Sequence, residues 1–157
     1  MNKQQLYTII DKKAPLITGL SDKIWEYAEL SMLEYKSTAA YVQILKEEGF
    51  EVTENLCNIP TAFSGSFGSG KPVIGILGEY DALSGLSQVA GATEKMPLEE
   101  NGCGQGCGHH LLGTGAIGAG MALRAWCDAH PGQGTVKVFG CPGEEGGSGK
   151  AYMVFNY

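Results

Sequence analysis

Two short runs of this sequence carry side chains that bind metal ions and transfer protons. The first is Cys107-Gly108-His109-His110, and the second is Pro142-Gly143-Glu144-Glu145-Gly146. Thiolate, imidazole and carboxylate groups are ligands for zinc and similar divalent ions, and a catalytic site needs about three protein ligands per ion plus an open position for water. The two runs therefore predict half of a metal-hydrolase site, whose other ligands must come from elsewhere.

Each run also has a simpler structural interpretation. Cys107 and His109 could lie in a glycine-rich turn that buries a thiol, and Glu144 with Glu145 could be a solvated pair at a helix start, favoured by the helix dipole. Asp81 could be a helix cap or a turn residue. The glycines and the proline around the two glutamates, directly after an apolar strand, favour a site in which one carboxylate binds metal and its neighbour acts as base.

Composition and charge argue against two classes of protein, those that bind nucleic acids and those that span a membrane. The 157 residues are 43% hydrophobic, enough to bury the core of one domain, and they carry a net charge of -6. This balance argues against nucleic-acid binding, and no apolar run approaches the roughly 18 residues of a membrane span. The polar first 13 residues do not resemble a signal peptide, so we expect a cytoplasmic protein whose five cysteines are free thiols or ligands.

Hydrophobic periodicity predicts the helices and strands around these runs. Apolar residues at helical spacing predict two helices between residues 4 and 30, divided by Pro15. Another helix should start after a Ser37 cap and end at Gly49. Strands are expected at residues 50–53, 61–67, 72–77 and 135–139, with a turn at residues 58–60 between the first two.

The second half of the chain predicts a parallel pair of strands in an α/β sheet. The apolar run at residues 72–77 is typical of a strand buried on both faces, and residues 111–129 would form the crossover helix that leads to the strand at 135–139. Ligands of such sheets gather outside the carboxyl ends of the strands. Three pairs of residues are predicted to converge there: Glu79 with Asp81, Cys107 with His109, and Glu144 with Glu145.

Three other motifs match known sites only in part. Residues 113–118 fit the dinucleotide pattern G-x-G-x-x-G, but no strand leads into them, so we expect a helix of small residues packed closely on the sheet. Gly149-Lys150 lacks the Ser or Thr of a phosphate-binding loop. Cys103 and Cys107 could begin a structural zinc site with His109 and His110, an alternative that Cys127 and His130 keep open.

Three longer stretches carry a resemblance to a known family. They are Gly78-Glu79-Tyr80-Asp81-Ala82-Leu83, Gly106-Cys107-Gly108-His109, and residues 134–150, which contain the paired glutamates. In this order they resemble the metal-dependent aminoacylase and carboxypeptidase family, metallopeptidase family 20, in its amidohydrolase branch. The resemblance runs from about residue 24 to residue 153, and several long motifs in the right order make chance a poor explanation.

The resemblance implies roles for the matching residues. Cys107, His109 and Glu145 would be metal ligands, Glu144 the general base that takes a proton from a metal-activated water, and Asp81 the residue that orients a ligand. The implied reaction is hydrolysis of the amide bond in N-acyl amino acids of the aminobenzoyl-glutamate type. The donor set suits zinc, and its oxygen ligands also admit manganese.

The resemblance also implies an incomplete enzyme. Residues 1–157 would be the amino-terminal portion of a catalytic domain, with a mixed, largely parallel sheet flanked by helices as in zinc-peptidase-like folds. The family's later ligand histidines, remaining strands and dimerisation domain would lie outside this portion. The expected partner is a small N-acyl amino acid, in a homodimer or hetero-subunit assembly. The alternatives are an inactive truncated remnant, a metal-binding module, or a subunit that a partner chain completes.

Overall fold

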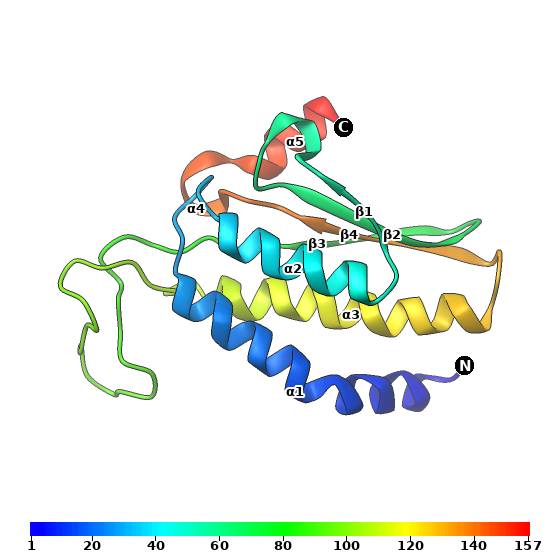
Figure 1. Cartoon of the computed structure of the whole chain (residues 1–157), viewed down its shortest axis with the longest axis horizontal. Coiled ribbons are helices and arrows are strands. Elements are labelled where there is room, and N and C mark those ends of the chain that lie inside the picture. Colours follow the sequence, from blue (N-terminus) through cyan, green and yellow to red (C-terminus); the bar gives the residue numbers. More distant parts are fainter.

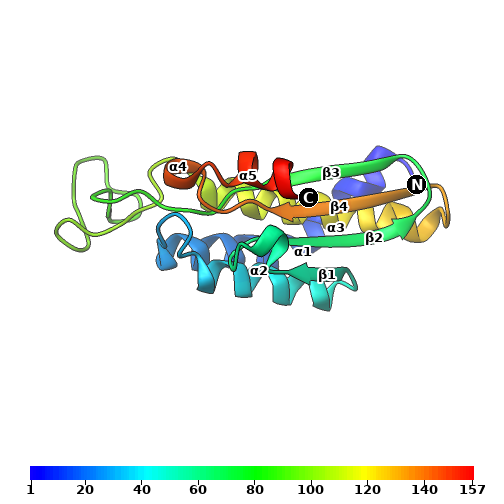
Figure 2. The same ribbon diagram turned by 90° about the horizontal axis from the view of Figure 1, so that it is seen from above.

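The computed structural model describes all 157 residues as a mixed sheet with helices on both sides (Figure 1). The four strands are β1 (Glu51–Glu54), β2 (Phe63–Ser69), β3 (Val73–Gly78) and β4 (Gly134–Gly140). The helices are α1 (Lys3–Tyr27), α2 (Tyr35–Glu47), the 3-10 helix η1 (Leu56–Asn58), α3 (His109–Ala129), α4 (Glu144–Gly147) and α5 (Gly149–Asn156). α1, α2 and α3 lie on one side of the sheet and α5 on the other (Figures 1 and 2).

The sheet confirms the predicted mixed α/β fold. Its strand order is β1-β2-β4-β3, with β1 and β2 antiparallel, β2 and β4 antiparallel, and β3 and β4 parallel. The parallel pair is the one that the crossover helix predicts, because α3 connects the end of β3 to the start of β4. The predicted strands before and after residues 58–60 are β1 and β2. No helix of the chain is both long and apolar enough to cross a membrane.

The prediction that the apolar strand β3 is buried on both faces is wrong. β3 is an edge strand with a single neighbour, and Val73 and Leu77 are 56% and 55% exposed. α3 covers the other face of β3, where Ile76 packs against the main core. The apolar composition of β3 is typical of a central strand, which has a paired strand on each side and a packed layer of helices on each face.

The prediction that Pro15 divides two helices is also wrong. α1 runs from Lys3 to Tyr27 with Pro15 inside it, and its axis bends part-way along (Figure 1). Proline removes one backbone hydrogen bond from a helix, and this loss commonly produces a kink. Two later residues of α1, Leu20 and Ile24, belong to the main core. Packing on the core therefore carries the helix through the proline.

Ser37 is not the cap of α2, because the helix starts two residues earlier at Tyr35. The carboxylate of Glu29 performs the capping function instead. It accepts hydrogen bonds from the backbone N–H of Lys36 at 2.9 Å and of Ser37 at 2.8 Å, and from the Ser37 hydroxyl at 2.8 Å. The free N–H groups of the first turn are thus satisfied by a residue that precedes the helix by several positions.

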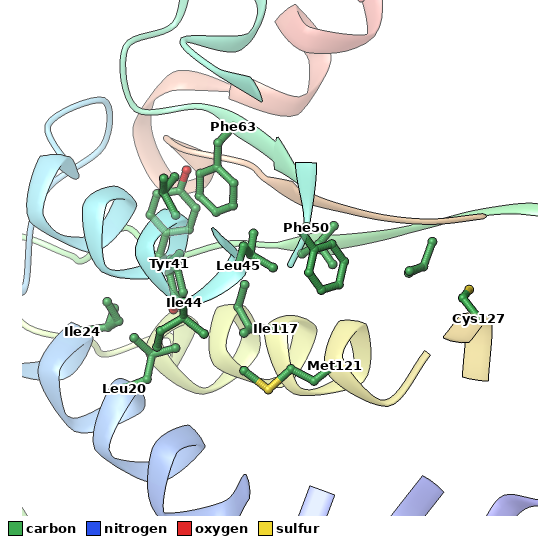
Figure 3. Packing of buried hydrophobic residues seen from close by; sticks show 14 residues of the cluster. Leu20, Ile24, Tyr41, Ile44, Leu45, Phe50, Phe63, Ile117, Met121 and Cys127 are labelled. Carbon is green, nitrogen blue, oxygen red and sulfur yellow. The ribbon is translucent and has the colours of Figure 1, made fainter. Parts of the chain in front are cut away.

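Aromatic side chains of the main core, among them Tyr41 and Phe63, pack against one another (Figure 3). Tyr41 of α2 and Phe63 of β2 lie with ring centroids 6.2 Å apart, and the ring of Tyr80 lies 5.4 Å from that of Tyr41. The Tyr80 hydroxyl donates to the carbonyl of Thr61 at 2.5 Å. Because Tyr80 immediately precedes Asp81, the core fixes the position of the first candidate site residue.

Candidate metal centre

The candidate site residues meet at the carboxyl ends of β3 and β4. The chain that follows β3, the start of α3 and the short helix α4 lie at the same end of the molecule (Figure 2). The ligand atoms of Cys107, His109 and Glu145 all lie within 4.8 Å of one another, and so do those of Glu79, His109 and Glu144. The predicted convergence of three separate segments is confirmed, and each predicted residue lies in or beside these two groups.

The imidazole of His109 is buried and has different partners at its two nitrogens. Nδ1 lies 3.0 Å from Oδ1 of Asp81 and 3.1 Å from the Asp81 carbonyl oxygen. Both are acceptors, so Asp81 offers partners for a proton on Nδ1. Nε2 faces the open side of the site, 3.1 Å from Oε2 of Glu79 and 3.8 Å from Oε2 of Glu144. Nε2 is therefore the ring nitrogen that lies beside the carboxylates and is open to a cation.

Asp81 is buried and links three segments of the chain. Its Oδ1 accepts from His109, while its Oδ2 accepts from the hydroxyl of Ser31 at 2.8 Å and from the backbone N–H of Glu145 at 2.9 Å. Both oxygens are occupied by donors. Asp81 is thus placed to orient an imidazole and a neighbouring turn.

Cys107, His109 and Glu145 offer one sulfur, one nitrogen and one oxygen donor around a common position. This set suits zinc, which takes three protein ligands and leaves a fourth position open at catalytic sites. The Glu145 carboxylate accepts a hydrogen bond from the Cys107 thiol and, with the neighbouring negative charges, raises the pKa of Cys107. A cation at the same position has the opposite effect and favours the thiolate. The residues present therefore fit a divalent metal ion.

Glu79 belongs to the second group. The sequence predicted that it lies at this edge of the sheet but assigned it no role as a ligand or base. One of its oxygens faces His109, and the other pairs with Lys150 of α5. Nε2 of His109 has one lone pair and can bind one ion, so the two groups share a ligand. The available signal in the sequence was the spacing from Asp81, because residues two apart in an extended chain point to the same side.

Glycine is required where the chain approaches itself beside the site. Gly143 has a φ of 64°, and a Cβ there would lie 2.7 Å from Cε of Met32. Gly113 lies in the motif G-x-G-x-x-G, where a Cβ would lie 2.4 Å from the carbonyl oxygen of Glu79. That motif lies inside α3, which confirms the predicted helix of small residues packed closely on its neighbours.

Nothing in the structure supports a separate structural zinc site. Neither group of potential ligands includes Cys103. Cys127 and His130 lie at the opposite end of α3 from His109, and a helix of 21 residues is about 30 Å long. His130 stacks on Trp126 with ring centroids 4.3 Å apart. Cys127 and His130 therefore lie far from Cys107 and His109.

Comparison with known proteins gives the family. The profile of peptidase family M20/M25/M40 matches residues 75–155, a range that contains all residues of the two ligand groups. The chain belongs to this family. It is 46% identical over 155 residues to one of the subunits of p-aminobenzoyl-glutamate hydrolase from Escherichia coli (strain K12), a match that covers 96% of this chain and 32% of that protein.

Two solved structures have the same fold as this M20 family chain. A dinuclear metal-binding M20 peptidase from Bacillus subtilis superposes with a TM-score of 0.76 at 23% identity, over 90% of this chain and 39% of that one. An aminobenzoyl-glutamate utilization protein from Klebsiella pneumoniae gives 0.67 at 16% identity, over 97% and 42%. The chain spans about a third of the length of the curated relatives that it matches.

Proposed function

We propose that this chain forms part of the active site of a metal-dependent amidohydrolase. The proposed reaction is cleavage of the amide bond in N-acyl amino acids of the aminobenzoyl-glutamate type. The observation that carries the proposal is the meeting of Cys107, His109 and Glu145 around one position, with the carboxylate of Glu144 beside them. Membership of the M20 family supports the hydrolase class, and the 46% identity to a hydrolase subunit named for p-aminobenzoyl-glutamate supports the substrate type.

The proposed chemistry divides the site into holding and proton-transfer residues. Cys107, His109 and Glu145 would hold a divalent cation, which when bound lowers the pKa of a water molecule and polarises an amide carbonyl. The Glu144 carboxylate would take the proton of the attacking water and return it to the leaving nitrogen. Asp81 would keep the proton of His109 on Nδ1 and so direct the Nε2 lone pair into the site. The products are a carboxylic acid and an amine or amino acid.

Zinc and manganese both suit the proposed site, for different reasons. The sulfur of Cys107 and the nitrogen of His109 favour zinc, whereas the carboxylates of Glu79 and Glu145 are ligands that manganese accepts well. We propose zinc as the ion, since a single thiolate strengthens the preference for a softer metal.

Replacement of the proposed base tests the reaction. In the full-length protein, Glu144→Gln should lower kcat for p-aminobenzoyl-glutamate by about 10²- to 10⁴-fold and leave the cation content unchanged, because the amide cannot accept the proton of the attacking water. Glu94→Gln, in the exposed loop before α3, is the matched control and should keep full activity. Unchanged turnover in Glu144→Gln would remove this residue from the mechanism.

A second candidate function is a subunit whose site another chain completes. Cys107, Glu144 and Glu145 are exposed on the open side of the site, and the E. coli relative is named as one subunit. Light scattering after size-exclusion chromatography, with and without co-expressed candidate subunits, distinguishes a homodimer from a hetero-subunit assembly. An inactive metal-binding remnant would instead keep zinc and show no turnover in any assembly.

A further inference from the structure

Residues 31–34, the last part of the connection between α1 and α2, lie against the turn that carries the proposed base. Glu34 is completely buried, and its Oε1 accepts hydrogen bonds from the backbone N–H of Met32 at 2.9 Å and of Gly143 at 2.8 Å. Gly143 is the residue directly before Glu144. One oxygen of one carboxyl group thus connects a loop near the start of the chain to the turn after β4.

We propose that Glu34 is a positioning residue that holds the turn of residues 143–145 and thereby sets the directions of the Glu144 and Glu145 side chains. The inference rests on the proposed function, which gives those two carboxylates their roles. It assigns to Glu34 no contact with substrate or with a cation, and all of its effect passes through the backbone of the turn.

Two buried carboxyl groups hold the turn on either side of Glu144. Glu34 accepts from the N–H of Gly143, and Asp81 accepts from the N–H of Glu145 at 2.9 Å. The residue between them is the proposed base. Hydrogen bonds from backbone N–H groups to carboxylates are among the stronger ones in proteins, so the two contacts restrict the turn on both sides of this residue.

The connecting loop and the turn also pack tightly on each other. Ser31 donates to Oδ2 of Asp81, so the loop contacts both carboxyl groups that hold the turn. A Cβ on Gly143 would lie 2.7 Å from Cε of Met32, and a Cβ on Gly147 would lie 2.5 Å from the same atom. No larger residue fits at these two positions without displacement of Met32. The loop is therefore a close-fitting support for the turn.

The turn needs support from outside because its own structure is weak. α4 has only four residues and no side-chain cap, and both its flanking residues, Gly143 and Ser148, have left-handed backbone conformations. A helix of one turn is unstable by itself, and a left-handed conformation at a residue other than glycine costs free energy. The Glu34 carboxyl group satisfies one N–H at the start of α4 that no residue of α4 can satisfy.

The chemistry of Glu34 indicates a role beyond filling space. Burial raises the pKa of Glu34, and hydrogen bonds from the backbone N–H groups of Met32 and Gly143 and from the Thr61 hydroxyl oppose this rise. A buried carboxyl group costs stability, and an apolar side chain of similar size would fill the same space without this cost. What the carboxyl group contributes in return is the pair of hydrogen bonds that its Oε1 accepts from Met32 and Gly143.

Two substitutions in the full-length protein separate the acceptor from the charge. Glu34→Gln keeps an oxygen that can accept from both N–H groups, whereas Glu34→Leu keeps the approximate size and removes the acceptor. We expect Glu34→Leu to speed the amide hydrogen exchange of Gly143 and Glu145 by about 10-fold or more. Glu34→Leu should also lower kcat and zinc affinity by about 10- to 100-fold with little change in KM. In Glu34→Gln, the amide exchange, kcat and zinc affinity should all stay near their wild-type values.

Leu45→Ala is the control for a general loss of stability. Leu45 is fully buried in the main core, and its truncation should destabilise the protein without a change in the exchange of the turn relative to the rest of the molecule. If Glu34→Leu does not fold, Glu34→Asp takes its place, because the shorter side chain withdraws the carboxyl group from Gly143 and should give the same effects in weaker form.

Two results would overturn the proposal. The first is a folded Glu34→Leu or Glu34→Asp protein with the hydrogen exchange and kcat of the wild type. The second is an equal loss of kcat in Glu34→Gln and Glu34→Leu with exchange of the turn unchanged in both. Absence of hydrolysis in the wild type would count against the proposed function alone, because hydrogen exchange decides the role of Glu34 without an assay of activity.

Discussion

His109 determines which of the two groups of ligands a cation can use. Its Nδ1 is occupied by Asp81, and its Nε2 faces two groups of potential ligands that cannot both use one lone pair. The group with Cys107 and Glu145 has three chemically different donors. The group with Glu79 has a carboxylate already paired with an ammonium group. The first group is therefore the better position for an ion.

Asp81 should be necessary for tight cation binding although it is not a ligand. In Asp81→Asn the side chain can no longer accept from both His109 and the backbone of Glu145, so zinc affinity should fall by about 10- to 100-fold. Competition with a chromophoric chelator measures this affinity. Asp128→Asn, at an exposed ion pair with Arg124, should leave it unchanged. Wild-type affinity in Asp81→Asn would contradict the orienting role.

Glu34 should make stability depend on pH. Its pKa is raised by burial above the ordinary value of 4.5, so the folded state binds the proton more tightly than the unfolded state. The stability that Glu34 contributes is present below pH 4.5 and is lost as pH rises through the folded-state pKa. Glu34→Gln removes this titration.

Urea denaturation over a pH series measures the effect. The free energy of unfolding of the wild type minus that of Glu34→Gln should decrease as pH rises above 4.5. The exposed substitution Glu99→Gln is the control and should give a smaller dependence. A difference that stays constant across the series would show that Glu34 has the same pKa in both states.

Spacing and residue type were enough to predict which residues approach one another, but not which acids support them. Cys107, His109 and Glu145 carry recognisable metal-binding chemistry, and the crossover from β3 to β4 places them together. In the sequence Glu34 falls between two predicted helices, where a glutamate usually lies in solvent. Its burial depends on contact with Gly143, which is 109 positions away, and no local pattern reports such a contact.

α3 is the element on which the site depends, because its glycines allow it to approach the chain after β3. Gly113→Ala should destabilise the protein by about 1–3 kcal/mol, since its Cβ would lie 2.4 Å from the Glu79 carbonyl oxygen and 2.6 Å from the Tyr41 hydroxyl. Gly115→Ala meets nothing within 4 Å and should stabilise the helix by about 0.5–1 kcal/mol. Urea denaturation measures both. Changes of the same sign would contradict the packing of α3.

The elements with the strongest periodicity were predicted correctly, and the errors concern the continuity of α1, the start of α2 and the exposure of β3. Residues 111–129 and 135–139 have clear helical and strand patterns, and α3 and β4 appear there. The error at Pro15 arose because packing of α1 outweighs one lost hydrogen bond. The error at Ser37 arose because Glu29, outside the helix, supplies the acceptor. Tertiary contacts decided each of these cases.

The molecule as a whole presents an apolar sheet edge that should promote self-association. β3 has an unpaired edge, and Val73 on it is 56% exposed. Val73→Lys should lower the apparent mass of the isolated chain in light scattering at a fixed concentration. Leu98→Lys replaces a side chain that is 66% exposed in the loop before α3, and it should have no such effect. Equal effects of the two substitutions would contradict a specific role for the edge.

The central claim is that Cys107, His109 and Glu145 hold one divalent cation, and elemental analysis of the purified, folded chain tests it most directly. We expect about one equivalent of zinc in the wild type and in Cys103→Ser, the cysteine control from the same loop, and loss of zinc in Cys107→Ser and Glu145→Ala. The same zinc content in all four proteins, or a folded wild type that binds none, would contradict the claim.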